Sequence, residues 1–136
     1  MSTRDFEQPL RKVYLMSDSN NLLAQLLDAY NSHDTDKVLS FFTDDAVFVS
    51  PVGPGPDGRH FIGQDEIREA VASRFKASPD VHWEAESHIV AATRGASSWL
   101  VTWTGEDGTK IAKRGCDLFD IRGDKVSRKD SFFKEV

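Results

Sequence analysis

The sequence predicts an α+β fold in which three N-terminal helices cover one face of a strongly curved antiparallel sheet. Between residues 19 and 77, apolar residues recur at helical spacing in three segments, with one strand between the second and the third. After residue 80, β-branched and aromatic runs are separated by the short turns RGAS, EDGT and RGD. Helices segregated from consecutive strands indicate the α+β class. A bent sheet closed by helices forms a cone, which is expected to enclose a pocket.

Three helices are expected in the first half. The first starts near Asp18, after which apolar residues lie three and four positions apart, at Leu22, Leu23, Leu26, Leu27 and Tyr30. A second, shorter helix is capped by Asp34 or Thr35 and carries Val38, Leu39, Phe41 and Phe42. The third begins in the segment GQDE (63–66), whose acids suit a helix N-terminus, and ends at SPD (78–80).

Five strands complete the predicted fold. Residues 43–45 (TDD) have turn chemistry, so the opening strand is predicted at about 46–50. The segment PVGPGPDGR is predicted as a loop at the rim of the pocket, because its three prolines cannot donate backbone hydrogen bonds. Four consecutive strands are predicted at 81–92, 97–105, 110–121 and 125–136.

Composition bounds the function. A chain of 136 residues holds one core, predicted as a single domain at 19–136 behind a loosely ordered extension at 1–18. A net charge of −5, without a basic run longer than two residues, argues against nucleic acid as a partner. One cysteine makes neither an internal disulfide nor a multi-thiolate metal site. No apolar segment is long enough for a membrane span or a secretory signal, so a cytoplasmic location without membrane partners is expected.

Three segments carry a resemblance to a known family: YNSHDTDKVLSFFTDDAVFVSPVG, FIGQDEIREAVASRF, and RGCDLFDIRGDKV followed by KDSFF. Together they resemble the nuclear-transport-factor-2-like superfamily, in its SnoaL-like and ketosteroid-isomerase-like branch, over roughly residues 19–136. The resemblance implies a cystatin-like roll and a homodimer formed through the outer sheet face. It also implies a family of isomerases, dehydratases, epoxide hydrolases and polyketide cyclases, so the fold alone does not choose the reaction.

The ketosteroid isomerase mechanism is not expected here. Where the isomerases carry an aspartate base before Pro-Val-Gly, this chain has Ser50, which cannot take a carbon-bound proton without a neighbouring base. The helix tyrosine of their oxyanion hole aligns with Leu26, whereas their strand aspartate matches Asp117. The arginine of an epoxide-hydrolase relay is also missing, because Gly115 stands two residues before Asp117.

Asp117 is the predicted acid/base residue. It shares a strand face with Phe119, so it is expected to point into the cavity, where burial would raise its pKa. The alternative is a structural aspartate paired with Lys113 or with a neighbouring strand. Its partner across the last hairpin depends on the turn: a two-residue turn places Asp130 opposite, and a three-residue loop with a bulge places Lys129 opposite. Alignment with the isomerases favours Lys129, with Ser131 and Phe133 also inward.

Aromatic residues supply the expected pocket wall, although simple core packing is the alternative for most of them. His60 follows the proline-rich loop and is expected at the cavity mouth. The predicted pocket residues are Phe48, Ser50, His60, Phe75, Trp83, Trp99, Trp103, Phe119, Ser131 and Phe133.

The segment HWEAESH (82–88) invites a metal site, which we do not predict. Its His and Glu residues alternate on one strand face about 6.6 Å apart, too far to converge on one ion. That face, His88 included, is expected to be wet or to form part of a dimer contact, with Ser87 and Ile89 directed to the core.

The sequence therefore predicts a SnoaL-like domain that acts without cofactor as an isomerase, cyclase or dehydratase on a small hydrophobic carbonyl compound. The alternative is a domain that binds a small hydrophobic ligand, or a protein partner, without chemistry.

Overall fold

The computed structural model describes residues 21–135, so the extension predicted at 1–18 lies outside the described residues. The helices are α2 (Leu22–Asn31), α3 (Thr35–Leu39) and α4 (Gly63–Ala77). The strands are β1 (Phe42–Val49), β2 (His60–Ile62), β3 (His82–Val90), β4 (Arg94–Thr104), β5 (Lys110–Arg122) and β6 (Lys125–Phe133).

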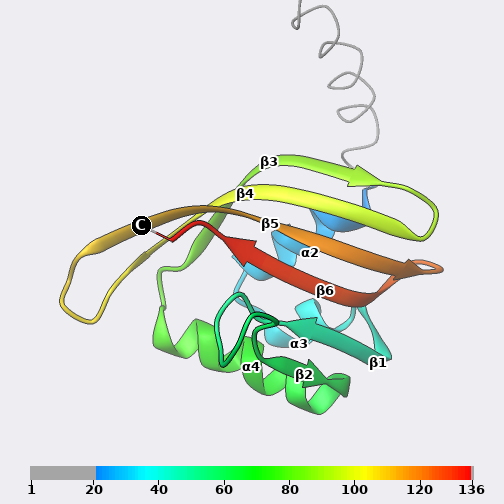
Figure 1. The fold of residues 1–136 in the computed structure, drawn as a ribbon, viewed down its shortest axis with the longest axis horizontal. Helices are drawn as coiled ribbons and strands as arrows, with labels where there is room; N and C mark the ends of the chain where they lie inside the picture. Colours follow the sequence, from blue (N-terminus) through cyan, green and yellow to red (C-terminus); the bar gives the residue numbers. More distant parts are fainter. Residues whose placement is uncertain (1–20, 136) are drawn as a thin grey trace, which may run out of the picture.

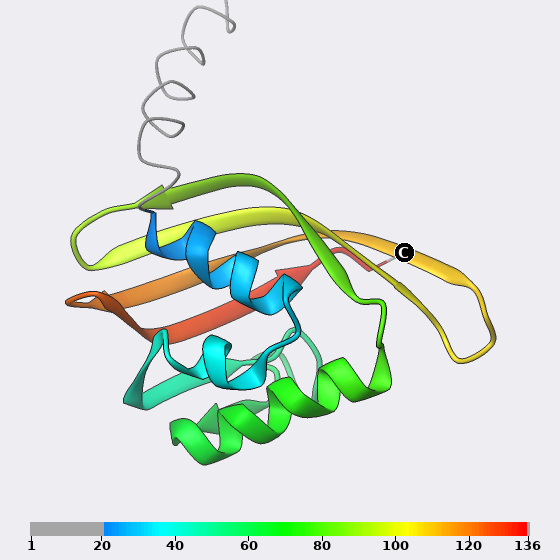
Figure 2. The ribbon, with the colours of Figure 1, turned by 180° about the vertical axis from the view of Figure 1, so that it is seen from behind.

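The strands form one curved, open sheet in the order β2-β1-β6-β5-β4-β3. The helices gather on one face of it, which Figure 1 shows from the sheet side and Figure 2 from the helix side. The predicted α+β class and the meander of the last four strands are confirmed. All pairs are antiparallel except β1 with β6, which are parallel.

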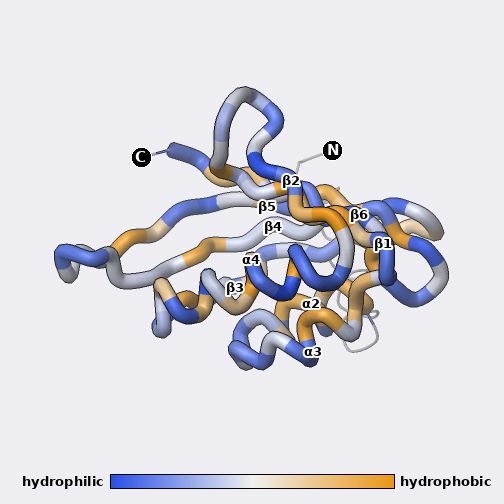
Figure 3. Tube along the Cα trace, turned by 90° about the horizontal axis from the view of Figure 1, so that it is seen from below, coloured by the Kyte–Doolittle hydropathy of each residue, from blue (hydrophilic) through white to orange (hydrophobic). Residues whose placement is uncertain are grey.

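Side-chain caps start the first two described helices, α2 and α3. The side chain of Asn21 accepts hydrogen bonds from the N–H groups of Leu23 and Ala24 and caps α2, and Asp34 caps α3 in the same way. The apolar stripes then bury against the sheet, since α2 packs on β3 and β4 and α4 packs on β1. In Figure 3 the tube is hydrophobic along much of α2, whereas the far end of the β4–β5 hairpin is hydrophilic.

The start of β1 differs from the prediction. The strand begins at Phe42, not near residue 46, so the supposed turn at 43–45 lies inside it. A register shift between Phe42 and Val47 absorbs these residues against β6. The side-chain amide of Gln64 donates to the carbonyl groups of Phe42 and Thr43, which supplies partners where the ladder is interrupted. The three-residue strand β2, which the sequence did not predict, then pairs with β1.

A second irregularity changes which residues of β3 face inward. The pairing of β3 with β4 shifts between Ala85 and Ser87, so the alternation of faces is reversed beyond that point. His88 is therefore buried, with Nδ1 2.7 Å from the hydroxyl oxygen of Ser97, and Ile89 is exposed. The prediction that His88 lies on the wet face and that Ile89 points to the core is wrong.

The outer face of the sheet carries exposed apolar side chains. Leu118 of β5 and Phe132 of β6 are both more than 40% exposed, on adjacent strands. The homodimer expected through this face stays a prediction, as does the cytoplasmic location. Between residues 21 and 135, no helix is long and apolar enough to cross a membrane.

One amide joins α2 to the edge strand β3. The side chain of Asn31 donates to the carbonyl oxygen of Trp83 and accepts from its N–H, both at 2.8 Å. Both backbone groups of Trp83 are thereby satisfied by a helix residue.

We expect Asn31→Ala to lower the free energy of unfolding by about 2 kcal/mol, because two partly buried backbone groups lose their partners. Urea unfolding measures the change. Asp28→Ala, at an exposed position of the same helix, is the control and should leave stability nearly unchanged. Equal stability of the Asn31 variant and the wild type would contradict the role of this bridge.

Candidate functional site

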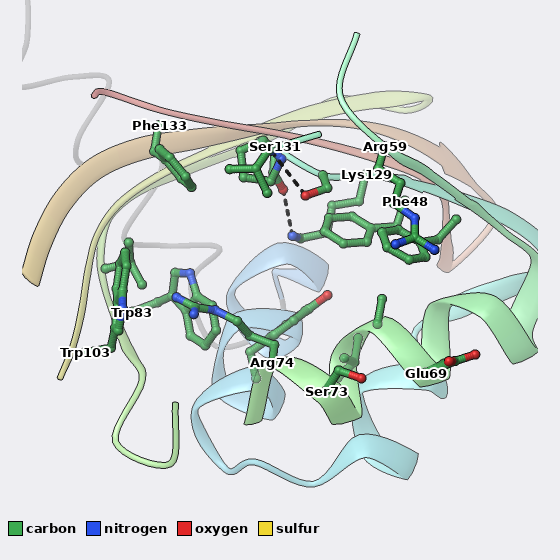
Figure 4. Close-up of a pocket in the computed structure, with 18 of the residues that line it drawn as sticks. Phe48, Arg59, Glu69, Ser73, Arg74, Trp83, Trp103, Lys129, Ser131 and Phe133 are labelled. Atoms are coloured by element: carbon green, nitrogen blue, oxygen red, sulfur yellow. Dashed lines mark hydrogen bonds between the residues drawn. The ribbon is translucent and has the colours of Figure 1, made fainter. Parts of the chain in front are cut away.

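A cavity of about 590 Å³ lies between the curved sheet and the helices, within the size range of small-molecule sites. Its wall is mainly aromatic. Seven rings line it, from α2, from four strands of the sheet and from the end of β6: Tyr30, Phe48, Phe61, Trp83, Trp99, Trp103 and Phe133. Figure 4 shows several of these rings around the space above α4.

Seven of the ten predicted pocket residues lie in this wall: Phe48, Ser50, Trp83, Trp99, Trp103, Ser131 and Phe133. The structure places the other three elsewhere. Phe75 stacks on His33 with ring centroids 4.5 Å apart, and Phe119 is buried in the core. His60 is exposed, because alternation along β2 presents Phe61 to the cavity instead.

Asp117 does not belong to the lining. It is 3% exposed and lies behind Ser131 and Trp99. The indole N–H of Trp99 donates to its Oδ2 at 2.8 Å, and the hydroxyl of Ser131 donates to its Oδ1 at 2.5 Å. The carboxylate thus sits one layer beneath the wall rather than projecting into the cavity as expected.

Lys129 is the charged group that reaches the wall at this point. Its Nζ lies 3.4 Å from Oδ1 of Asp117 and donates to the hydroxyl oxygen of Ser131 at 2.9 Å. The ammonium also lies 4.9 Å from the ring centre of Tyr30 and 4.7 Å from that of Phe48. Figure 4 shows Lys129 and Ser131 joined by this hydrogen bond beside Phe48.

Two opposing effects set the protonation of Lys129. Burial alone would lower the pKa of this amine, but the neighbouring Asp117 carboxylate raises it, and the net pKa is above the ordinary 10.5. Lys129 is therefore an ammonium at neutral pH. It can donate hydrogen bonds to an oxygen atom in the cavity, and it is not a base or an amine nucleophile there.

Of the two predicted partners across the last hairpin, Lys129 forms the ion pair with Asp117, but neither of the two predicted registers occurs. The turn is the two-residue type, with Arg122 opposite Lys125, but a register shift between Asp120 and Ile121 moves the ladder by one residue. Ser131 therefore lies opposite Asp117, and Lys129 reaches it along the same face. Asp130 lies opposite Leu118 on the other face, with its carboxylate 3.9 Å from Arg128.

The hydroxyl group of Tyr30 is a second donor beside Lys129. It is buried beside the ammonium of Lys129, and its proton has no acceptor among the described residues. Burial raises the pKa of this phenol above 10.0, so the group is neutral and can donate to a ligand. The sequence pattern treated Tyr30 only as an apolar position of α2 and did not predict a role as hydrogen-bond donor. A tyrosine expected in a buried helix stripe was the available signal, because its hydroxyl needs a hydrogen-bond partner.

Other charged residues of the wall were also missed. Arg59, Arg74 and Lys113 line the cavity, and the described lining contains two carboxylates, Glu66 and Glu69, both exposed on α4. Among the described residues, no three His, Cys, Asp or Glu side chains are grouped to hold a metal ion.

The family model described as a SnoaL-like domain matches residues 23–129. No curated protein matches the chain.

Solved structures share the fold. A hypothetical protein with a ketosteroid isomerase-like fold from Catenulispora acidiphila, in complex with trimethylamine, has a TM-score of 0.74 at 14% identity, covering 83% of this chain and 85% of that one. TerC, co-crystallised with polyporic acid, has a TM-score of 0.72 at 19% identity over 83% and 88% of the two chains. SalBIII, an epoxide hydrolase/cyclase-like enzyme of pyran ring formation in salinomycin, has a TM-score of 0.72 at 20% identity with the same coverage.

We expect Asp117→Asn to destabilise the protein by about 3–5 kcal/mol, because it leaves the buried ammonium of Lys129 without a counter-charge. Lys129→Met should cost less, since Trp99 and Ser131 still donate to Asp117. The double variant should be more stable than the two single losses predict, by at least about 1 kcal/mol. Chemical unfolding measures this cycle, with Asp120→Asn, on the exposed face of β5, as the control. Additive losses would show that the two charges are not coupled.

The same ion pair predicts a loss of stability at alkaline pH. Because the pKa of Lys129 is higher in the folded state than its ordinary 10.5, its contribution is full below pH 10.5 and is lost as pH rises through the folded-state value. Tyr30 acts in the same direction, since burial raises its pKa too. Unfolding free energy measured from neutral pH to above 10.5 should fall more steeply for the wild type than for Lys129→Met. Parallel curves would be inconsistent with a charged, paired Lys129.

Proposed function

The chain belongs to the SnoaL-like domain family, and on this basis we propose that it isomerises, cyclises or dehydrates a small hydrophobic carbonyl compound without a cofactor. The observation that carries the proposal is the ammonium of Lys129, fixed by Asp117 at the wall of an aromatic cavity. The three reactions share a transition state in which negative charge develops on a carbonyl oxygen.

In this proposal Lys129 and Tyr30 are the donors for that oxygen. A fixed ammonium and a buried phenol in a site shielded from water stabilise an enolate more than water does. Neither group needs to move far, since Lys129 is held by Ser131 and Asp117. Asp117 then acts through Lys129, as a positioning residue, and not on the substrate itself.

The proton acceptor in this proposal is Glu69. Of the two carboxylates in the described lining, Glu66 already accepts a hydrogen bond from the N–H of Ile62 at 3.1 Å. Glu69 is the other, one turn further along α4. Proton transfer from the carbon next to the carbonyl group to Glu69 would produce the enolate that Lys129 and Tyr30 stabilise.

Hydrogen exchange in deuterium oxide tests enolate formation without knowledge of the product. A panel of hydrophobic ketones is incubated with the protein, and mass spectrometry follows deuterium uptake next to the carbonyl group. Lys129→Gln should slow the exchange of an active ketone about 100-fold to about 1000-fold, the usual cost of an oxyanion donor. Lys134→Gln, at an exposed position after β6, is the control. Full activity of the Lys129 variant would exclude the mechanism.

Binding without chemistry is the second candidate. It is favoured by the position of both lining carboxylates, which are exposed on α4 rather than buried beside Lys129. The exchange experiment separates the two, because a ligand that is retained in native mass spectrometry but takes up no deuterium supports binding alone.

A further inference from the structure

The arginines of the described residues divide into two groups. Five of them lie within 4 Å of a carboxylate: Arg68, Arg94, Arg114, Arg122 and Arg128. Arg59 and Arg74 have no carboxylate partner among the described residues, and both line the cavity. Each guanidinium instead lies over an aromatic ring, Arg59 over Phe61 and Arg74 over Trp103. The unpaired guanidinium groups are thus concentrated at the cavity.

Arg74 is the more enclosed of the two. It extends from α4 with its Cζ 4.5 Å from the ring centre of Trp103, and Figure 4 shows it directed into the space beside Trp83 and Trp103. One nitrogen, Nη1, donates to the hydroxyl of Ser78 at 3.0 Å, which leaves the other N–H donors of the guanidinium available to a ligand. Burial lowers the pKa of this guanidinium, as is expected for a cation without a compensating anion.

Lys113 adds a second cation at the same end of the cavity. Its Nζ lies 4.5 Å from the ring centre of Phe133 and 6.0 Å from that of Trp103, so both cations contact the Trp103 ring. Its carboxylate partner, Glu135, is 3.6 Å away and 81% exposed. The Lys113 side chain is mostly buried, whereas its partner carboxylate stays hydrated near the end of the chain, so an anion held inside the cavity can replace that carboxylate.

The two ends of the cavity differ in how enclosed their unpaired cation is. At the Lys129 end the buried ammonium is neutralised by Asp117, which suits it to donate to a neutral carbonyl oxygen, and the unpaired guanidinium there, that of Arg59 over Phe61, is exposed to solvent. At the Trp103 end Arg74 has no counter-charge among the described residues. The whole chain carries a net charge of −5, so this positive end runs against the overall charge.

We propose that the ligand is a hydrophobic organic acid whose anionic group binds Arg74 and Lys113, while its ring body lies among the tryptophans. Under the function proposed above, on which this inference rests, the substrate is an aromatic or polycyclic oxo acid. Its carboxylate is anchored at Trp103 and its carbonyl group reaches Lys129. A guanidinium can bind a carboxylate through two parallel hydrogen bonds, so Arg74 would fix the orientation of the ligand as well as select its negative charge.

Two fluorescent dyes with the same ring skeleton test this proposal. Anilinonaphthalene sulfonate carries an anionic group, and phenylnaphthylamine is its neutral counterpart. We expect Arg74→Gln to weaken binding of the anionic dye about 10-fold, the loss of one charge-assisted contact, and to change the neutral dye less than about 2-fold. Lys113→Gln should have a smaller effect of the same kind. High salt should weaken the binding of the anionic dye only.

The controls distinguish the loss of a charge contact with the dye from a general loss of folding. Arg68→Gln lies on the same helix outside the cavity and should leave both dyes unchanged. Arg74→Lys keeps the charge but loses the forked donor geometry, so its affinity for the anionic dye should fall between those of the wild type and Arg74→Gln. This variant replaces the glutamine variant as the test if the latter does not fold. Thermal unfolding of each variant checks the fold.

The outcomes are distinct. Equal weakening of both dyes by Arg74→Gln would assign Arg74 to packing on Trp103 and overturn the proposal. Unchanged binding of the anionic dye would overturn it as well, while leaving the proposed function intact. Failure of the wild type to bind either dye would remove the hydrophobic cavity as a ligand site, and with it both proposals.

Discussion

The buried pair of Asp117 and Lys129 is the interaction on which the rest of the structure depends. Trp99 and Ser131 satisfy the carboxylate, and the ammonium lies between the rings of Tyr30 and Phe48. The pair thus joins β4, β5 and β6 to helix α2 and to β1. An ion without its partner at this depth would cost several kcal/mol, about as much as many domains have in total. The same ion pair that holds these elements together also fixes the ammonium of Lys129 at the cavity wall.

Most of the fold was predictable, and its irregularities were not. The spacing of Leu23, Leu26 and Leu27 fixed the first helix, and Gly-containing turns separated the last four strands. The wrong predictions share a physical cause: a bulge adds one residue and reverses the alternation of faces, and no turn residue or change in composition marks its position. One such shift buries His88, and another moves Ser131 opposite Asp117. Asp44 and Asp45 have turn chemistry, yet they lie in a strand because Gln64 supplies hydrogen bonds to the neighbouring carbonyl groups.

For the candidate site, the sequence predicted most of the aromatic residues that line the cavity but not the charged groups that carry its chemistry. Strand alternation placed Trp99, Trp103 and Phe133 in the lining, because side chains on one face of a strand share an environment. It could not decide depth, so Asp117 was expected at the surface of the cavity instead of beneath it. The helix contributions were missed for a similar reason. Tyr30 and Arg74 both have the spacing of residues in the buried stripe of a helix, and only the assembled sheet gives either one a cavity to face.

Every tryptophan of the chain lies in the cavity wall, since Trp83, Trp99 and Trp103 are its full complement. They differ in surroundings: Trp99 donates to a carboxylate, Trp103 lies beneath a guanidinium, and Trp83 meets the edge of Tyr30. With excitation that indole absorbs and phenol does not, the fluorescence of the native protein therefore originates from residues of this cavity wall. A bound ligand would change the surroundings of these indoles, so the intrinsic tryptophan fluorescence of the unlabelled chain would report whether the cavity is occupied.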